Sequence, residues 1–404
     1  MTEPAEKTNI QDGVEVRAIR EEEREECIKL WCAVFKFNDN DAYFRRYFFG
    51  DVEWLPYYTQ VALVDGKMVS AVHICKRTVA CGDLRLTMGG IANVVTLPKY
   101  RKRGLNTRCL QSAVAVMEAD AMDFSLLFTG IIPYYERLGY ASLTRESFEG
   151  AIRPDLVLSP SPYTVRDAVA EDLPAIRACY DSYNKKRPLT VQRYEAYWRD
   201  WLRVMPDRIP YGLIVAVDAK ETVAGYAFIS PEENTRAITE LCIANEAAIL
   251  PLIETAAARS LEKGRKRLGI SAPMETPVRD AAEQTLKNIK TEVSTGAMAR
   301  VLHRDNLFRS WAMEMNDRWI RAQRPQGMLT FQTPYGLTRL DATGAFLRVG
   351  TVEEARDVLP QSAFFHILFG FMNAASVSRD AAVHPLIRAL LPAEKPVYYR
   401  ADGF

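Results

Sequence analysis

The 404-residue sequence lacks several features that would assign a protein to a class at once. Its seven cysteines, at positions 27, 32, 75, 81, 109, 179 and 242, form no Cys-x-x-Cys pair, which argues against a disulfide framework and a zinc site. No apolar run approaches the roughly 20 residues of a membrane helix, and the polar start MTEPAEKTNIQDG has no signal-peptide core. We therefore expect reduced cysteines, no metal, no membrane span and a cytoplasmic location.

An excess of charge of either sign is also missing. The 52 Lys and Arg residues nearly balance the 51 Asp and Glu residues, giving a net charge of +1. The chain therefore lacks the broad basic field of a nucleic-acid-coating protein, and we predict no nucleic-acid partner. The motifs G-x-x-x-x-G-K-[ST] and G-x-G-x-x-G are absent as well. Their absence argues against ordinary nucleoside triphosphate and dinucleotide binding.

What the sequence does contain is an internal repeat. The stretches VEVRAIREEEREECIKLWCAVF (14–35) and YTVRDAVAEDLPAIRACYDSY (163–183) each run from a short strand through an acidic turn into an amphipathic helix. A pair of strands follows each stretch, at 59–74 and at 213–229. Similarity at the length of a whole domain predicts a duplicated fold.

The chain is longer than one hydrophobic core usually serves, which favours two or three domains. A proline-bearing stretch at 152–165 suits a linker between the two copies, and the pattern of strands and helices changes after about residue 295. We predict a mixed α/β (α+β) protein of three domains, with boundaries 1–152, 153–294 and 295–404.

One short segment concentrates cations. Lys99, Arg101, Lys102, Arg103 and Arg108 surround Gly104, where a buried strand (89–98) gives way to a helix. The start of a helix presents unpaired N–H groups, and a glycine lets an anion approach them, so the segment predicts a pyrophosphate cradle. The alternatives are a solvated helix start or a nucleic-acid patch. The second copy, at ITELCIANEAAIL (238–250), has no such loop.

The segment Arg101-Lys102-Arg103-Gly104-Leu105-Asn106 resembles the Arg-x-x-Gly-x-Gly/Ala loop of GNAT N-acetyltransferases, with Asn106 in place of the usual small residue. The order of strands and helices around it and the segment YYERLGYAS (134–142) are also similar to that family. The resemblance implies acetyl-CoA as the cofactor and a strand bulge that directs the Val94 N–H to the thioester carbonyl. The implied cofactor-binding residues are Val94, Val95, Thr96, Arg101, Lys102, Arg103, Gly104, Leu105 and Asn106.

The same resemblance implies that Tyr135 is the general acid. The alternative is an aromatic side chain that only packs the start of its helix. The histidines, at positions 73, 303, 366 and 384, show no ligand spacing, and we expect core or surface roles for them.

The C-terminal KPVYYRADGF has the apolar content of a segment that is tucked in rather than frayed. Two GNAT-like copies, of which the first alone carries the loop, and a third domain that ends in Phe404 resemble the Eis (enhanced intracellular survival) acetyltransferases. The resemblance implies a sterol-carrier-like third domain, the terminal carboxylate of Phe404 as general base, and a homo-oligomer, a hexamer. The alternative is a tail that only seals an interface.

Residues 35–51 are expected to shape the acceptor pocket, through Phe35, Phe37 and Asp39, and Asp402 is expected there too. These residues are equally explained as core aromatics and solvated acids. Gly403 stands where relatives that accept aminoglycosides commonly carry an acid. The predicted function is acetyl-CoA-dependent N-acetylation of a small-molecule or peptide amine. The alternatives are transfer of a longer acyl group, or a non-enzymatic apolar-ligand carrier or scaffold with a relict GNAT fold.

Overall fold

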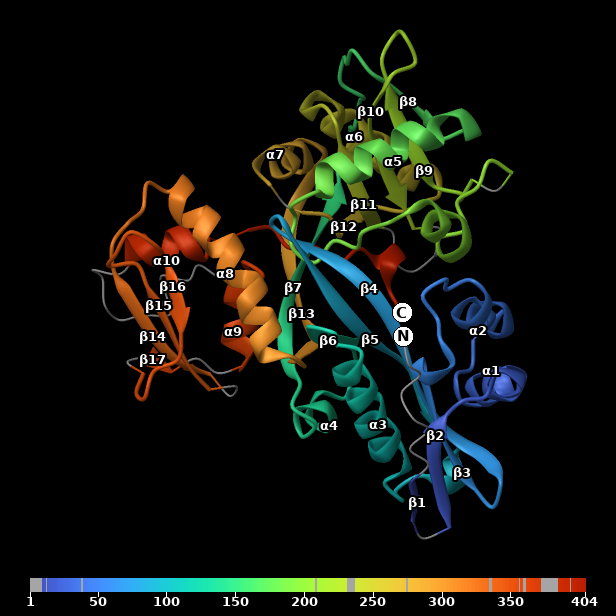
Figure 1. Ribbon diagram of the computed structural model, residues 1–404. Helices are drawn as coiled ribbons and strands as arrows, with labels where there is room; N and C mark the ends of the chain where they lie inside the picture. Colours follow the sequence, from blue (N-terminus) through green and yellow to red (C-terminus); the bar gives the residue numbers. More distant parts are fainter. Residues whose placement is uncertain are drawn as a thin grey trace.

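A computed structural model describes residues 9–404 except 12, 38, 208, 231–236, 274, 334–335, 356, 359–360, 372–383 and 393. A single sheet of 13 strands runs through two modules of the molecule (Figure 1), in the order β1-β2-β3-β4-β5-β6-β13-β7-β12-β11-β10-β9-β8. The mixed α/β fold class is therefore confirmed.

The first module holds one half of this sheet between two pairs of helices. Helices α1 (Arg24–Val34) and α2 (Asn40–Phe49) bury aromatic and aliphatic side chains against one face, and α3 (Leu105–Ala119) covers the other with α4 (Ile132–Glu136). Its strands are β1 (Asn9–Gln11), β2 (Val14–Ala18), β3 (Thr59–Val64), β4 (Lys67–Cys81), β5 (Leu84–Thr96), β6 (Phe124–Phe128) and β7 (Ala141–Ile152).

The second module repeats this arrangement with shorter strands. Its helices are α5 (Leu173–Asn184), α6 (Ile249–Glu262) and α7 (Thr276–Thr285). In each module one neighbouring pair is parallel, β5 with β6 in the first and β11 with β12 in the second. The strands are β8 (Thr164–Asp167), β9 (Leu213–Val217), β10 (Val223–Ile229), β11 (Ala237–Ile243) and β12 (Arg267–Ile270).

A matching ion pair at the start of each module supports the duplication. Arg17 donates two hydrogen bonds to Glu23, at 2.7 and 2.6 Å, and Arg166 donates two to Asp172, at 2.7 and 3.0 Å. Each carboxylate also accepts from a backbone N–H three residues before it. The repeat detected in the sequence therefore forms the same turn twice.

Strand β13 (Leu286–Val301) joins the two modules. It leaves α7 of the second module, pairs with β7 over most of its length, and pairs with β6 through residues 297–301. The expected boundary at residue 295 falls inside this strand, whereas the boundary at 152 coincides with the end of β7. The division into three independent domains stays a prediction.

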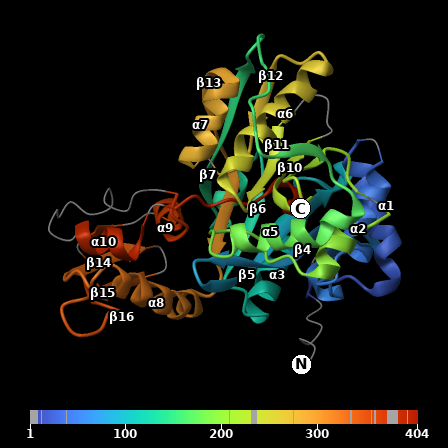
Figure 2. The ribbon, with the colours of Figure 1, turned by 90° about the horizontal axis from the view of Figure 1, so that it is seen from above.

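The remaining C-terminal part stands to one side of the two modules, as the view from above shows (Figure 2). It begins with α8 (Arg304–Arg321), a helix the sequence reasoning missed, and continues into a small sheet of order β16-β15-β14-β17. An apolar segment at 362–371 begins in α9, and the residues from 372 to 383 lie outside the described residues. The other elements are β14 (Met328–Thr333), β15 (Gly336–Asp341), β16 (Arg348–Gly350), β17 (Asp357–Val358), α9 (Gln361–Leu368) and α10 (His384–Leu390).

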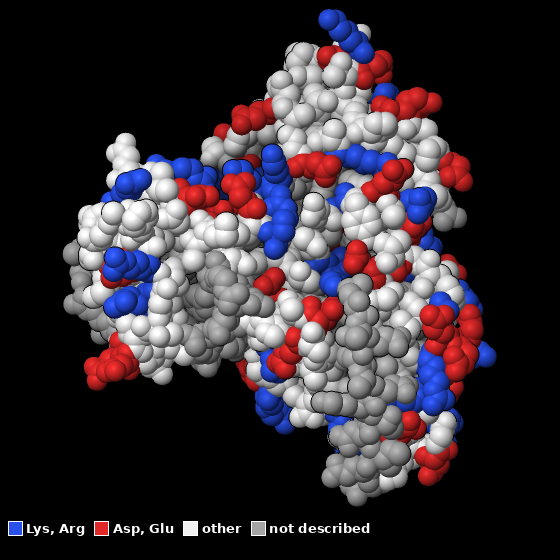
Figure 3. Space-filling view, viewed as in Figure 1, with Lys and Arg blue, Asp and Glu red and all other residues white. Residues whose placement is uncertain are grey.

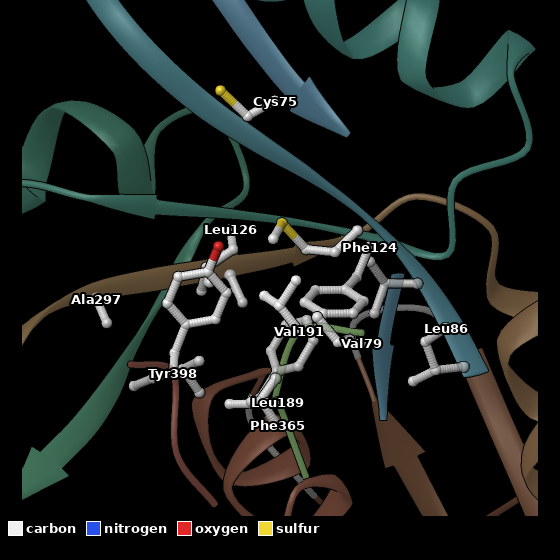
Figure 4. Close-up of a cluster of buried hydrophobic side chains, with 14 of the residues drawn as sticks. Cys75, Val79, Leu86, Phe124, Leu126, Leu189, Val191, Ala297, Phe365 and Tyr398 are labelled. Atoms are coloured by element: carbon white, nitrogen blue, oxygen red, sulfur yellow. The ribbon is translucent and has the colours of Figure 1, made fainter. Parts of the chain in front are cut away.

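One buried apolar cluster ties the three parts together (Figure 4). Phe124 of β6, Val191 from the second module, Phe365 of α9 and Tyr398 of the C-terminal segment all contribute to it. Each of these side chains is at most 6% exposed. Burial of this kind supplies most of the stability of such an assembly, so the tail and the C-terminal part are integral to the core.

The C-terminal segment is tucked in, as its composition predicts. Asp402 is fully buried and accepts hydrogen bonds from Arg193, at 2.8 Å to each oxygen, and from Tyr197 at 3.1 Å. Arg193 is also paired with Glu240 of β11. Burial raises the pKa of Asp402 against the opposing effect of Arg193. The segment is thus fastened to the second module by a buried ion network.

Asp402→Ala is expected to lower the free energy of unfolding by about 3–5 kcal/mol, because it removes one partner of a buried charge pair. Asp41→Ala, which removes an exposed partner of Arg45, is the matched control and should cost less than about 1 kcal/mol. Urea unfolding of both variants measures the difference. Equal stability of the two would mean that the network does not fasten the tail.

Candidate active site

The site begins where two parallel strands part. β5 and β6 pair from Met88 with Phe124 to Ile91 with Leu127, and β5 then continues to Thr96 without β6. Just past this point β5 has a bulge, because it advances three residues from Ala92 to Val95 while the paired stretch of β4, between His73 and Ala71, advances two. Asn93, inside the bulge, has a left-handed φ of 49°. The bulge predicted beside Val94 is therefore present, where β5 continues beyond its pairing with β6.

The cationic loop forms the N-terminus of α3. Gly104 is the residue before the helix, with a φ of 74°, and no side chain caps the first turn. Arg101, Lys102 and Arg103 are exposed around it, and Arg101 Nε also donates to Thr96 O at 3.2 Å. Uncapped N–H groups, the positive end of the helix dipole and these cations make an anion site.

A cavity of about 290 Å³ connects the bulge to this loop. It has the elements that coenzyme A would need. A Cβ at Gly104 would enter open space, so the glycine leaves the first turn of α3 accessible, and Asn106 Oδ1 is buried with no hydrogen-bond partner. Of the predicted cofactor-binding residues, Arg103 is absent from the wall. The others line it: Val94, Val95, Thr96, Arg101, Lys102, Gly104, Leu105 and Asn106.

The equivalent position in the second module is closed. There the chain enters α6 through Asn245, whose side chain accepts a hydrogen bond from Ala247 N at 3.0 Å. This bond uses an N–H group that a phosphate would need, and no Arg-x-x-Gly precedes the helix. The geometry thus restricts a GNAT-type cradle to the first module.

The two tyrosines of α4 differ in their surroundings. Tyr134 lines the cavity, and its hydroxyl lies 3.2 Å from Thr107 Oγ1. Tyr135 is 8% exposed and packs between Tyr134 and Tyr140, with ring centroids 5.0 and 6.1 Å away. Burial raises the pKa of Tyr135, so its phenol keeps its proton above the usual range. Sequence reasoning did not single out Tyr134 as a cavity residue.

His73 is a core residue of the first module. It is fully buried, its Nδ1 lies 2.8 Å from Thr59 Oγ1, and burial together with Arg77 lowers its pKa to about 3. His73, Asp51 and Cys75 have ligand atoms close enough to hold a metal. Both oxygens of Asp51, however, accept hydrogen bonds from Arg77, and that guanidinium disfavours a second cation there.

A second cavity, of about 480 Å³, surrounds the chain terminus and has Phe128, the last residue of β6, in its wall. The Phe404 ring packs 5.4 Å from Phe128 and 5.9 Å from Tyr398, and it covers Gly90 of β5 so closely that a Cβ there would overlap it. Figure 1 shows the C-terminus at the middle of the molecule, between α2 and the second module. This cavity is the candidate acceptor pocket.

The four residues predicted for that pocket do not line it. Asp402 is held in the buried network with Arg193, and Asp39 is exposed before α2. Phe35 and Phe37, 36% and 46% exposed, pack on Phe44 at the outer side of α2.

The segment 35–51 contributes to the acceptor cavity through other residues. Tyr43 and Arg46 of α2 line it, together with Arg145 of β7. The signal for the first two was the run of arginines among aromatics in AYFRRYFFGD. Nothing in the sequence around Arg145 distinguishes it from other strand arginines, because its neighbours come from distant parts of the chain.

The acetyltransferase (GNAT) domain family matches residues 15–143. This stretch spans the bulge, the loop and both tyrosines of α4. Residues 15–143 belong to the GNAT acetyltransferases. The protein is therefore an acyltransferase. No curated protein sequence matches the chain.

Solved structures extend the likeness to the whole chain at the level of fold. An Enterococcus faecalis protein described as a probable N-acyltransferase is 16% identical with a TM-score of 0.71, covering 97% of this chain and 99% of its own. A GCN5-related N-acetyltransferase from Kribbella flavida is 17% identical with a TM-score of 0.68, covering 97% and 98%. Eis1 from Mycobacterium abscessus is 12% identical with a TM-score of 0.65, covering 97% and 100%. The Eis-like arrangement beyond the GNAT domain is thus confirmed as a fold, and the sterol-carrier likeness stays a prediction.

Among the described residues, no helix is both long and apolar enough to cross a bilayer.

Gly104→Val is expected to raise the dissociation constant of acetyl-CoA at least about tenfold, because the new side chain enters the cradle and displaces one or more charge-assisted hydrogen bonds. Gly264→Val is the matched control: Gly264 has the same φ of 74° and the same open surroundings, but it follows α6. Titration calorimetry with acetyl-CoA measures both. Equal weakening in the two variants would attribute the effect to backbone strain and not to the cradle.

Proposed function

We propose that this protein is an acetyl-CoA-dependent N-acetyltransferase that acts on a small-molecule or peptide amine by direct transfer. The observation that carries the proposal is the presence of two cavities, one between the β5 bulge and the cationic loop and one at the chain terminus beside the end of β6. The gap beyond Ile91 and Leu127 would let an acyl donor in the first cavity meet an amine in the second. A transferase for a longer acyl group would use the same two cavities.

Acetyl-CoA would supply an activated thioester. The first turn of α3 and the side chains of Arg101 and Lys102 would hold its diphosphate. The bulged strand would present the Val94 N–H as a donor to the thioester oxygen, where negative charge develops during transfer. A preformed backbone donor stabilises that charge without reorganisation.

Tyr135 is the proposed general acid. Its phenol would give a proton to the sulfur as the carbon–sulfur bond breaks and the amide bond forms. Burial keeps this hydroxyl protonated, which is the state that an acid must have. Tyr134 is the competing candidate, because its side chain lines the coenzyme cavity.

The terminal carboxylate of Phe404 is the proposed base. Where Phe404 is the last residue of the chain, its carboxylate would take the proton that the attacking amine loses. The Asp402 network, the Arg46 hydrogen bond to Gly403 O at 3.2 Å and the packing of the Phe404 ring on Gly90 hold this end in the acceptor cavity.

Thiol release from acetyl-CoA in the presence of an amine panel tests the function. Tyr135→Phe should lower kcat by about 100-fold or more, because it removes the proton donor, with acetyl-CoA affinity unchanged. Tyr134→Phe is the matched control and should stay within about threefold of the parent in kcat, an allowance for the loss of its Thr107 contact. Because burial raises the pKa of Tyr135, kcat of the parent should show no loss from its ionisation below about pH 10.

A large loss in Tyr134→Phe with an active Tyr135→Phe would transfer the acid role to Tyr134. Release of thiol from none of the amines, by a protein that binds acetyl-CoA, would contradict the proposed function itself.

Extension of the chain by two glycines after Phe404 should lower kcat at least about 100-fold, because it replaces the carboxylate by a neutral amide. Gly90→Ala should have a similar effect, because the new methyl group overlaps the Phe404 ring and displaces the terminus. Steady-state rates at saturating acetyl-CoA measure both. Combining Gly90→Ala with Phe404→Ala removes the overlap and should restore part of the rate. Full activity of the extended chain would exclude the carboxylate from the reaction.

A further inference from the structure

Among the described residues, three arginines line the acceptor cavity, Arg46, Arg145 and Arg400, against one carboxylate, the terminal group of Phe404 that is proposed as the base. Arg145 of β7 has its guanidinium 5.2 Å from the centre of the Phe128 ring. Arg46 of α2 lies over the rings of Tyr43, at 4.3 Å, and Trp201, at 4.4 Å. Both arginines are half-buried, and neither has an ion-pair partner among the described residues.

Other arginines in this protein behave differently. Within the part of the chain that the structure describes, the four arginines with less than 9% of their surface exposed are each paired with a carboxylate: Arg17 with Glu23, Arg77 with Asp51, Arg193 with Asp402, and Arg318 with Glu314. Over the outer face seen in Figure 3, both signs of charge are interspersed. Half-buried arginines are less uniform, since Arg153, Arg265 and Arg339 also have no carboxylate partner among the described residues. What sets Arg46 and Arg145 apart is that they face the same cavity, where desolvation makes a counter-charge favourable.

Glu146 and Glu394 line a neighbouring cavity together with Arg145, but no ion pair joins either of these side chains to it. The described residues that line the acceptor cavity include no Asp or Glu side chain. Burial lowers the pKa of Arg145, with Tyr398 opposing it, so an anion that enters would be bound the more strongly. Aromatic rings form much of the remaining wall, those of Tyr43, Phe128, Phe228, Tyr398 and Phe404.

We propose that the acceptor is a small amine that also bears a carboxylate on an apolar, ring-containing body, with Arg145 as the residue that recognises the carboxylate and Arg46 as a second positive charge. The inference rests on the proposed function and names its substrate class. A planar guanidinium binds a carboxylate through two parallel hydrogen bonds, and the aromatic walls suit the apolar body. A polycationic amine would meet repulsion from both arginines.

Binding in the absence of acetyl-CoA tests the recognition apart from any reaction. The probes are phenylalanine and 4-(aminomethyl)benzoate, which place the amine at two different distances from the carboxylate, each compared with its neutral carboxamide. We expect each acid to bind about 10- to 100-fold more tightly than its amide, which corresponds to one charge-assisted pair. Spermidine represents polycations and should bind more weakly than the acids.

Substitution locates the effect. Arg145→Met should remove the preference for acid over amide and leave amide binding unchanged, and Arg145→Lys should retain part of the preference. Arg153→Met is the matched control, because Arg153 follows the same strand but bonds to Glu283 O at 2.8 Å, away from the cavity. Thermal melts of all variants check that they fold.

The outcomes separate this inference from the proposed function. Equal affinity for acid and amide, an acid preference that survives in Arg145→Met, or tighter binding of spermidine would each overturn the inference. Thiol release with neutral or cationic amines in preference to the acids would also overturn it while leaving the transferase function intact. Acid-selective binding that depends on Arg145, without thiol release from any amine, would uphold the anion site and contradict the transferase function.

Discussion

The separation of β5 from β6 is the constraint on which the rest of the site depends. The strands pair through Ile91 and Leu127 and then part at a bulge whose Asn93 adopts a left-handed conformation. Beyond this pair β6 no longer accompanies β5, and the cavity at the cationic loop opens beside the bulge, against Val94, Val95 and Thr96. The bulged part of β5 is thus left outside the parallel ladder, where an acyl donor can be bound.

The two modules and the C-terminal part contribute to this opening unequally. The first module supplies the cationic loop, whereas the second has its corresponding helix capped by its own Asn245. What the second module supplies instead is Arg193, which holds Asp402 and with it the chain terminus. Strand β13 crosses from the second module into the first, so the gap and Glu240, which pairs with Arg193, belong to one continuous sheet. A degenerate copy therefore serves as the support for the tail.

Local features were predictable from the sequence, and long-range ones were not. The loop at Gly104, the bulge near Val94 and the duplicated turn at Arg17 are encoded in runs of adjacent residues, and each is present. The place of β13 between β6 and β7 is decided by pairing over more than a hundred residues, which periodicity does not report. Asp402 was predicted to lie in the acceptor pocket, because its buried partner Arg193 is distant in sequence and the pairing could not be recognised there.

The same distinction explains why the acceptor cavity was the weakest part of the sequence-based prediction. A cation beside a glycine at a helix start can be recognised as a motif in the sequence, because the positive end of the helix dipole already favours an anion at that position. The role of Arg145 depends instead on which acidic side chains lie within reach of its guanidinium, and only the packed structure shows this. The chain has 52 basic and 51 acidic residues, but this overall balance does not determine the net charge at the wall of the acceptor cavity. Arginines that outnumber the one terminal carboxylate at a cavity wall keep a net positive field there, and that field favours a ligand that compensates it.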